Sequence, residues 1–325
     1  MRRFTSYLRG EDMKRRIIFI LVLVLLLPMT ARADAIRWVD FGVPYESLKY
    51  TMDADIRTAE QEQHISWIDI LAVAACRTGG KCSLPSVKRA YSELLTGKDP
   101  EQILGDVYKY YSYYHDAYDA VLGGLLGNYA VQIDGQWKTV YGLKAFSPIA
   151  AGYGYSHCAD FGNQRSFGFA RKHLGNDLMG SQGTPIVAVE GGVVEAMGWN
   201  RYGGWRIGIR SFDSKRYYYY AHLQKDKPFA KDLQEGDIVQ AGDVIGYMGR
   251  TGYSDKENVN NIETVHLHFG MQLVFDESQK ECLSEIWIDV YNIVRLLQEH
   301  RSSTVYSQGH FVRKYPFVDL DIDTL

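Results

Sequence analysis

Hydrophobic residues recur with a helical period in the first half of the chain. The stretch 65–76 (ISWIDILAVAAC) carries a broad apolar face and is followed by Gly79 and Gly80, which favour the end of a helix. A second amphipathic stretch covers residues 87–95. Asp99 and Pro100 supply an N-cap and a first-turn proline for a third helix. The pattern therefore predicts helices from residue 46 to about residue 131.

The pattern changes near residue 131, where short apolar runs begin to alternate with glycine turns. These runs lie within residues 184–199, 205–212, 215–223, 236–249 and 265–275. Their spacing is typical of an antiparallel β domain, and residues 285–300 (EIWIDVYNIVRLLQEH) predict a final helix. We therefore expect an α+β protein: a helical domain of unknown role over residues 34–141, then an antiparallel β-rich domain with a C-terminal helix over residues 142–325.

The first 33 residues are predicted to be a targeting segment. A basic stretch, Lys14–Arg16, precedes the apolar residues 17–29, which are shorter than the ~20 residues of a membrane-spanning helix. Ala31-Arg32-Ala33 then offers a small-x-small cleavage pattern. We expect a cleaved signal peptide; an uncleaved membrane anchor through residues 17–29 is the alternative. Both place residues 34–325 outside the cytoplasm.

Composition narrows the class of protein further. The chain has 325 residues, of which 46% are hydrophobic and 23% charged, and this is typical of a globular protein. The formal net charge of -3 gives no electrostatic reason to expect nucleic acid or a bilayer surface as a partner. An exported protein can form disulfides, so Cys76–Cys82 and Cys158–Cys282 are one interpretation of the cysteines, and unpaired, partly buried thiols are the other.

A run of tyrosines marks the third predicted helix. Two interpretations are open for it: stacking against the sugar rings of a glycan, or aromatic packing within the helical domain with the hydroxyls reaching water. Helical spacing favours packing. The run consists of Tyr108, Tyr110, Tyr111, Tyr113, Tyr114 and Tyr118.

Two histidines on a predicted strand give the first indication of chemistry. Residues two apart on a strand point to the same face, so His266 and His268 project together while Leu267 and Phe269 project into packing. Two neighbouring imidazoles suit a metal ion or a reacting group better than an apolar core.

An H-x-x-x-D motif supplies further metal ligands. Gly175 argues against a regular helix between His173 and Asp177, so a turn or loop is expected there. Together with His266 or His268, His173 and Asp177 provide two nitrogens and one oxygen, an ordinary ligand set for catalytic zinc. His222 and the other histidine of the pair would then remain to act as base and oxyanion donor.

These segments together resemble peptidase family M23, which includes lysostaphin and LytM. The resemblance covers about residues 161–275. Besides the histidine motifs it rests on short runs that occur in the family's order, which are Gly183-Thr184-Pro185-Ile186, Tyr220-Ala221-His222-Leu223, Glu235-Gly236-Asp237, Gly249-Arg250-Thr251-Gly252 and His266-Leu267-His268-Phe269.

The resemblance implies a role for each site residue. It implies that His173, Asp177 and His268 hold a zinc ion, and that His222 and His266 activate water and stabilise the tetrahedral intermediate. The chain would then be an exported zinc metallo-endopeptidase (a hydrolase of the cell wall) that cuts peptide bonds of bacterial peptidoglycan. A non-catalytic M23-like scaffold in sporulation or cell-division machinery is the alternative. The helical domain has no such resemblance and could bind the wall, bind a partner or cover the groove.

Overall fold

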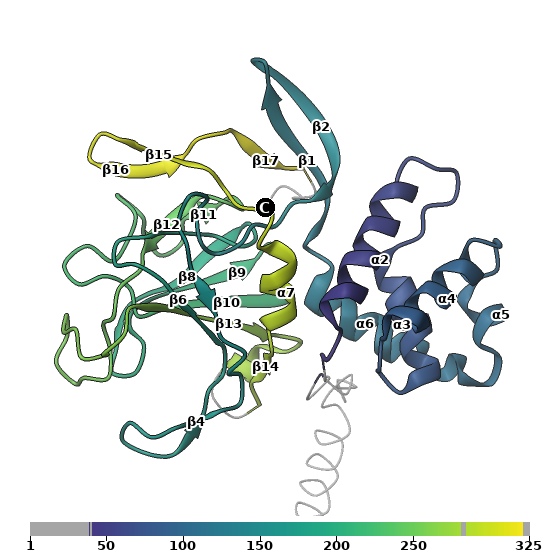
Figure 1. The fold of residues 1–325 in the computed structure, drawn as a ribbon, viewed down its shortest axis with the longest axis horizontal. Coiled ribbons are helices and arrows are strands. Elements are labelled where there is room, and N and C mark those ends of the chain that lie inside the picture. Colours follow the sequence, from purple (N-terminus) through teal and green to yellow (C-terminus); the bar gives the residue numbers. More distant parts are fainter. Residues whose placement is uncertain (1–38, 40, 281–283, 321–325) are drawn as a thin grey trace, which may run out of the picture. The chain divides into compact units, whose positions relative to one another are not determined.

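The computed structural model describes residue 39 and the ranges 41–280 and 284–320 (Figure 1). The predicted targeting segment over residues 1–33 and Cys282 lie outside these residues. Among the helices of the described ranges, none combines the length and apolar character needed to cross a membrane.

The helical half is built around α3. Its helices are α2 (Tyr45–Thr58), α3 (Trp67–Thr78), α4 (Leu84–Leu94), α5 (Pro100–Leu104) and α6 (Tyr111–Leu122), with a 3₁₀ turn, η1 (Gly105–Tyr110), before α6. The Ser66 side chain caps α3 by accepting from the Ile68 amide, and Asp99 caps α5 in the same way at Gln102. Gly79, with φ of 63°, ends α3 in the left-handed conformation. The predicted helices are therefore confirmed up to residue 122, except that the third is divided at Gly105 into α5, η1 and α6.

The tyrosine run divides between the core and the surface. Tyr118 is buried, and Tyr111 is partly buried and donates its hydroxyl to Asp69 at 2.5 Å. Tyr110 and Tyr113 are exposed on the same segment. Packing therefore accounts for the inward-facing members of the run.

The helical pattern ends earlier than the sequence predicts. Strands β1 (Leu126–Ile133) and β2 (Gln136–Leu143) form a hairpin that also pairs with β17 (Phe317–Asp319). The turn between β1 and β2 is Asp134-Gly135, both at positive φ, which is a strong two-residue hairpin signal. The prediction of helix up to about residue 131 is wrong because this turn fixes residues 126–133 as a strand.

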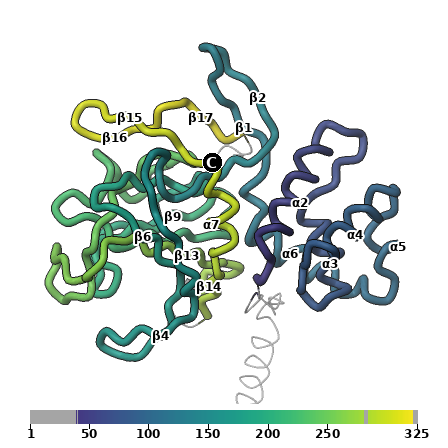
Figure 2. The backbone as a smooth tube through the Cα atoms, viewed as in Figure 1, coloured from purple at the N-terminus to yellow at the C-terminus, as the bar shows by residue number. Residues whose placement is uncertain are grey.

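The rest of the chain forms a twisted antiparallel sheet with smaller strand pairs around it (Figures 1 and 2). The main sheet has the order β11-β8-β9-β10-β13-β6-β3, and β14 pairs with the second half of β13. Its strands are β3 (Ser156–His157), β6 (Asn176–Met179), β8 (Gly192–Asn200), β9 (Gly204–Ser211), β10 (Arg216–Ala221), β11 (Ile238–Val239), β13 (His266–Leu273) and β14 (Ile286–Ile288). The smaller pairs are β4 (Gln164–Arg165) with β5 (Arg171–Lys172), β7 (Pro185–Val187) with β12 (Val244–Tyr247), and β15 (Thr304–Ser307) with β16 (His310–Arg313). The predicted α+β fold class is confirmed.

The predicted C-terminal helix over residues 285–300 is shorter than expected. Residues 286–288 are strand β14, and α7 (Tyr291–Leu297) begins only after Val290. Ile286 and Ile288 are buried while Trp287 is partly exposed, so the side chains alternate with the period of a strand. Pairing with β13 therefore overrides the helical pattern of the first residues in this stretch.

Alternation along the central strands separates the core from an open face. Ile207, Ile209, Tyr218 and Tyr220 point into one hydrophobic cluster that also contains Leu71 of α3. The residues between them on β9 and β10 point to the opposite face of the sheet. That open face carries the functional residues described below.

The cysteines of the helical half are separate thiols, so the predicted Cys76–Cys82 disulfide is wrong. Both are buried, and burial raises the pKa of each thiol to about 11. The Cys82 sulfur lies 3.4 Å from the Tyr118 hydroxyl, so it packs toward α6. The alternative interpretation, buried unpaired thiols, describes these two residues; Cys158 is also free.

A buried arginine joins the helical half to the sheet. Arg216 of β10 is fully buried and makes a two-pronged ion pair with Glu190, with distances of 2.8 and 3.0 Å. It also donates to the Ala120 carbonyl of α6 at 2.9 Å. A side chain at Gly124 would overlap both members of the pair, so the chain passes directly over it. The Tyr218 hydroxyl donates to Glu190 at 2.6 Å, and Arg216 also pairs with Asp213 at 2.7 Å.

Replacing Arg216 by methionine is expected to lower the free energy of unfolding by about 3–5 kcal/mol, because Glu190 would be left buried without its counter-charge. Urea denaturation followed by circular dichroism measures this. The double variant Arg216→Met/Glu190→Leu should be more stable than the single variant. Arg89→Met, on the surface of α4, should change the free energy by less than about 0.5 kcal/mol. A single variant as stable as Arg89→Met would contradict the assignment.

Candidate metal centre

Three strands, β6, β10 and β13, and the turns beside them bring the predicted site residues together at the open face of the sheet. His173 comes just before β6 and Asp177 lies within it, while His266 and His268 project from β13. His222 directly follows β10. The pairing of β13 with β6 sets His268 directly opposite Asp177. The turn expected between His173 and Asp177 is present, since the strand begins only at Asn176.

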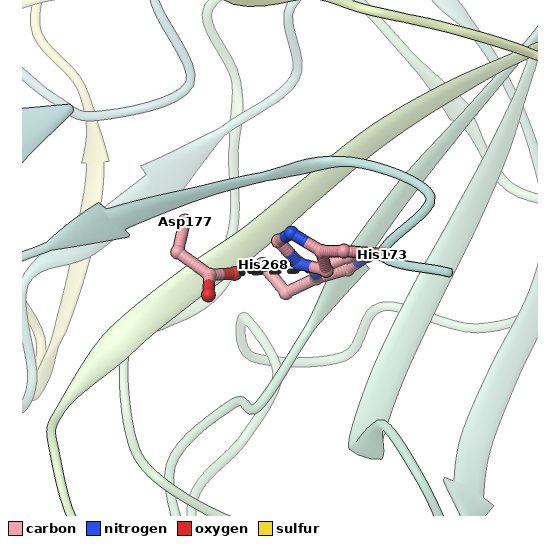
Figure 3. Close-up of side chains that lie close together, drawn as sticks. All are labelled: His173, Asp177 and His268. Carbon is pink, nitrogen blue, oxygen red and sulfur yellow. Dashed lines mark hydrogen bonds and ion pairs between the residues drawn. The ribbon is translucent and has the colours of Figure 1, made fainter. Parts of the chain in front are cut away.

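Three of these side chains present ligand atoms to a common point (Figure 3). His173 Nε2 lies 2.8 Å from His268 Nδ1 and 3.1 Å from Asp177 Oδ1, and the remaining separation, between His268 Nδ1 and Asp177 Oδ1, is 3.3 Å. Ligands at about 2.0–2.1 Å around a tetrahedral zinc ion lie about 3.3 Å apart. Two nitrogens and one oxygen at these separations suit Zn²⁺, with a coordination position left for water.

Two residues that the sequence did not single out hold these three candidate ligands in place. Arg165 Nη2 contacts Asp177 Oδ2 at 3.0 Å, which leaves Oδ1 turned toward the histidines. His173 Nδ1 donates to the Asp160 carbonyl at 3.1 Å, and this turns Nε2 toward Asp177 and His268. Arg165 also pairs with the Asp160 carboxylate at 2.8 Å. No spacing rule points to either residue, because both lie in loop and short-hairpin segments before the motif.

Burial and charge act on the three ligand groups in different directions. Burial lowers the pKa of His173, but hydrogen bonds to Asp160 and Asp177 outweigh it and raise that pKa to about 9. Burial likewise opposes ionisation of Asp177, yet hydrogen bonds with His173 and His268 hold its pKa well below the usual range. For His268, burial dominates and lowers the pKa. Asp177 is therefore an anion that the neighbouring imidazoles stabilise.

The other two histidines flank the ligand cluster. The ring of His222 lies 4.8 Å from that of His266 and 5.8 Å from that of His268, measured between centroids. His222 Nδ1 donates to the Thr251 carbonyl at 2.9 Å, and His266 Nδ1 donates to the Thr264 carbonyl at 2.8 Å. Each imidazole is thereby fixed with Nε2 free to accept a proton or a hydrogen bond. Burial lowers the pKa of His222 well below its ordinary value, which keeps the ring neutral.

The five residues line a groove of about 600 Å³. The groove continues along the open face of β8, β9, β10 and β13. Its other lining residues include Asn200, Arg206, Arg210, Tyr217, Tyr219, Gln272 and Trp287. The open face can therefore accept an extended chain that crosses the ligand cluster.

Comparison with known proteins finds a family match over part of the chain, residues 171–280. The sequence profile of peptidase family M23 matches residues 171–280. An L-Ala–D-Glu endopeptidase of Bacillus subtilis is 42% identical over 124 residues, which is 38% of this chain and 36% of that protein. Lysostaphin of Staphylococcus simulans is 37% identical over 98 residues, 30% of this chain and 17% of that protein. The match thus spans about a third of the length of the first relative and less of the second.

A solved structure resembles a larger part of the chain. A Ruminococcus gnavus protein described as a glycyl-glycine endopeptidase LytM superposes with a TM-score of 0.54, covering 84% of this chain and 95% of that one at 23% identity. At that identity the likeness concerns the fold, and it extends well beyond residues 171–280. The sequence matches, with the site geometry, assign residues 171–280 to peptidase family M23.

Proposed function

We propose that the chain is an exported zinc endopeptidase that hydrolyses peptide bonds of bacterial peptidoglycan. The observation that carries this proposal is the convergence of His173 Nε2, Asp177 Oδ1 and His268 Nδ1 to within 3.3 Å of one another, beside two buried histidines, in an open groove. In this proposal those three side chains hold the ion, and His222 and His266 act on water and substrate.

In this arrangement the ion and the two histidines contribute different steps of the hydrolysis. When bound, zinc lowers the pKa of water and polarises a carbonyl. The Nε2 atoms of His222 and His266 both face the cluster, since their Nδ1 atoms are used by backbone carbonyls. One imidazole takes the proton of the attacking water at its free Nε2 and passes it to the leaving amine. Its neighbour donates to the developing oxyanion when its Nε2 carries a second proton, because the Nδ1 proton is used by a backbone carbonyl.

The substrate is inferred from the relatives. One is named for an L-Ala–D-Glu bond and another is described as a glycyl-glycine endopeptidase, so the relatives differ in the bond they cut. Export follows from the targeting segment predicted over residues 1–33. Digesting peptidoglycans of known cross-link type with the purified protein and identifying the products by mass tests this function. Release of new amino groups from none of them would favour the alternative, a non-catalytic scaffold.

His268→Ala is expected to remove both bound zinc and activity, because it deletes a ligand. His266→Ala should retain zinc and lose activity by about 10²- to 10⁴-fold, because it deletes a proton-transfer group. Zinc content by atomic absorption and amino-group release measure the two effects separately. His310→Ala, which changes a histidine of the β15–β16 hairpin, is the matched control and should alter neither. Equal loss of zinc in the first two variants would overturn the roles within the H-x-H pair.

Zinc affinity is expected to rise with pH, by about tenfold per unit between pH 6 and pH 9. His173 has a pKa of about 9 in the metal-free protein, so below that pH a proton occupies the nitrogen that the metal needs. Competition with a coloured chelator at several pH values measures the affinity. Asp160→Asn weakens the hydrogen bonding that raises this pKa, so it should move the rise to lower pH. A flat profile in the unmodified protein would contradict the role of His173.

A further inference from the structure

The groove is positively charged within a chain whose formal net charge is -3. Arg165 is neutralised by Asp160 and Asp177, and Arg210 by Glu195. Among the described residues, however, three lining cations have no carboxylate partner: Arg171, Lys172 and Arg206. In the same part of the chain, one lining carboxylate, Glu285, has no cationic partner. The excess of positive charge favours a substrate that carries negative charge.

Of these three cations, Arg206 is the one that lies on the main sheet, in β9. Ala221 pairs with His268, and Ile207 pairs with Tyr220, so Arg206 lies one residue further along, level with Ala221. It is therefore in the same cross-strand row as His268 and two strands away, a separation of about 10 Å between backbones. The long side chains of an arginine and of a substrate glutamate can together span that gap.

The surroundings of Arg206 leave its guanidinium available. It is partly buried, and no hydrogen bond or ion pair engages its side chain among the described residues. Burial raises the pKa of Tyr217 to about 12, and the charge of Arg206 opposes that shift. Burial also raises the pKa of Tyr219, and the same charge opposes that shift as well. The guanidinium therefore lies close to both rings. Tyr217 lies across Gly208, where any side chain would collide with its hydroxyl. The floor beside Arg206 is thus flat and aromatic.

Arg210 lies four residues from Arg206 on the same face of β9, and its contacts are those of an arginine with a structural role. A register shift in β8 between Val194 and Ala196 turns Glu195 toward the groove, where it contacts Arg210 Nε at 2.8 Å. Arg210 also donates to the Ser214 carbonyl at 3.0 Å and is buried. Among the residues that the structure describes, Arg210 therefore has a carboxylate partner and Arg206 has none.

We propose that Arg206 determines substrate specificity by binding a carboxylate on the substrate residue beside the scissile bond, so that the preferred substrate is an acidic peptide rather than a glycine bridge. The proposal rests on the proposed peptidase function and adds the class of peptide. A guanidinium presents a planar fork of donors that matches a carboxylate, and a partly buried position strengthens the contact relative to water. A peptide without a charged side chain would leave the fork unused.

The test compares matched peptides on the full-length, zinc-loaded protein. One peptide contains an Ala–D-Glu bond with the free carboxylate, the second carries a carboxamide at that position, and the third is pentaglycine. We expect kcat/KM for the carboxylate peptide to exceed that for the carboxamide by about ten- to a hundredfold. Arg206→Gln should reduce this ratio to about one, with its zinc content unchanged. Arg89→Gln removes the same charge from the surface of α4 and should keep the ratio.

Three results separate the outcomes. If the unmodified protein cleaves pentaglycine or the carboxamide as fast as the carboxylate peptide, the specificity proposal is wrong and the peptidase function stands. If Arg206→Gln keeps the preference, Arg206 is not its source and the proposal fails. If no peptide is cleaved, calorimetry measures the binding of the carboxylate and carboxamide peptides to the zinc-loaded His266→Ala variant. Tighter binding of the carboxylate peptide supports the role of Arg206, while the peptidase function fails. Equal binding of the two peptides overturns both.

Discussion

The register between β13 and β6 is the constraint on which the site depends. Antiparallel pairing sets His268 directly opposite Asp177, and the same register keeps Leu267 and Phe269 in the core. A slip of one residue would send both histidines of β13 into the hydrophobic cluster and the two apolar side chains into the groove. The burial of Leu267 and Phe269 therefore fixes the register, and the register in turn fixes the distance between imidazole and carboxylate.

The same sheet serves as core on one face and as binding surface on the other. Large aromatic residues fill the inner face of β10, whereas glycines such as Gly208 keep the outer face flat enough for a peptide. The helical half is joined to the inner face through the Arg216–Glu190 pair and the carbonyl of Ala120. This leaves the groove open, and nothing in the described contacts links α6 to the ligand cluster.

Side chains of the same type differ in charge and in role because their surroundings differ. His222 is neutral because burial and the neighbouring imidazoles lower its pKa, whereas His173 gains charge stabilisation from two carboxylates. The arginines divide similarly: Arg165 and Arg210 are neutralised by carboxylates of the protein, and Arg206 has no carboxylate partner within the described part of the chain. In both cases the neighbours decide the role, as expected where low dielectric strengthens each nearby charge.

The sequence by itself determined the elements whose signals are local. Helical periodicity gave α3, and alternation with the H-x-H motif gave a strand that carries two histidines on one face. Only the tertiary structure decided which segments meet. Pairing with β13 made residues 286–288 a strand within a predicted helix, and packing toward α6 kept Cys82 a free thiol. Arg165 reaches Asp177 from a separate short hairpin. Such contacts join residues far apart in the chain, so their geometry follows from packing and pairing that no local pattern records.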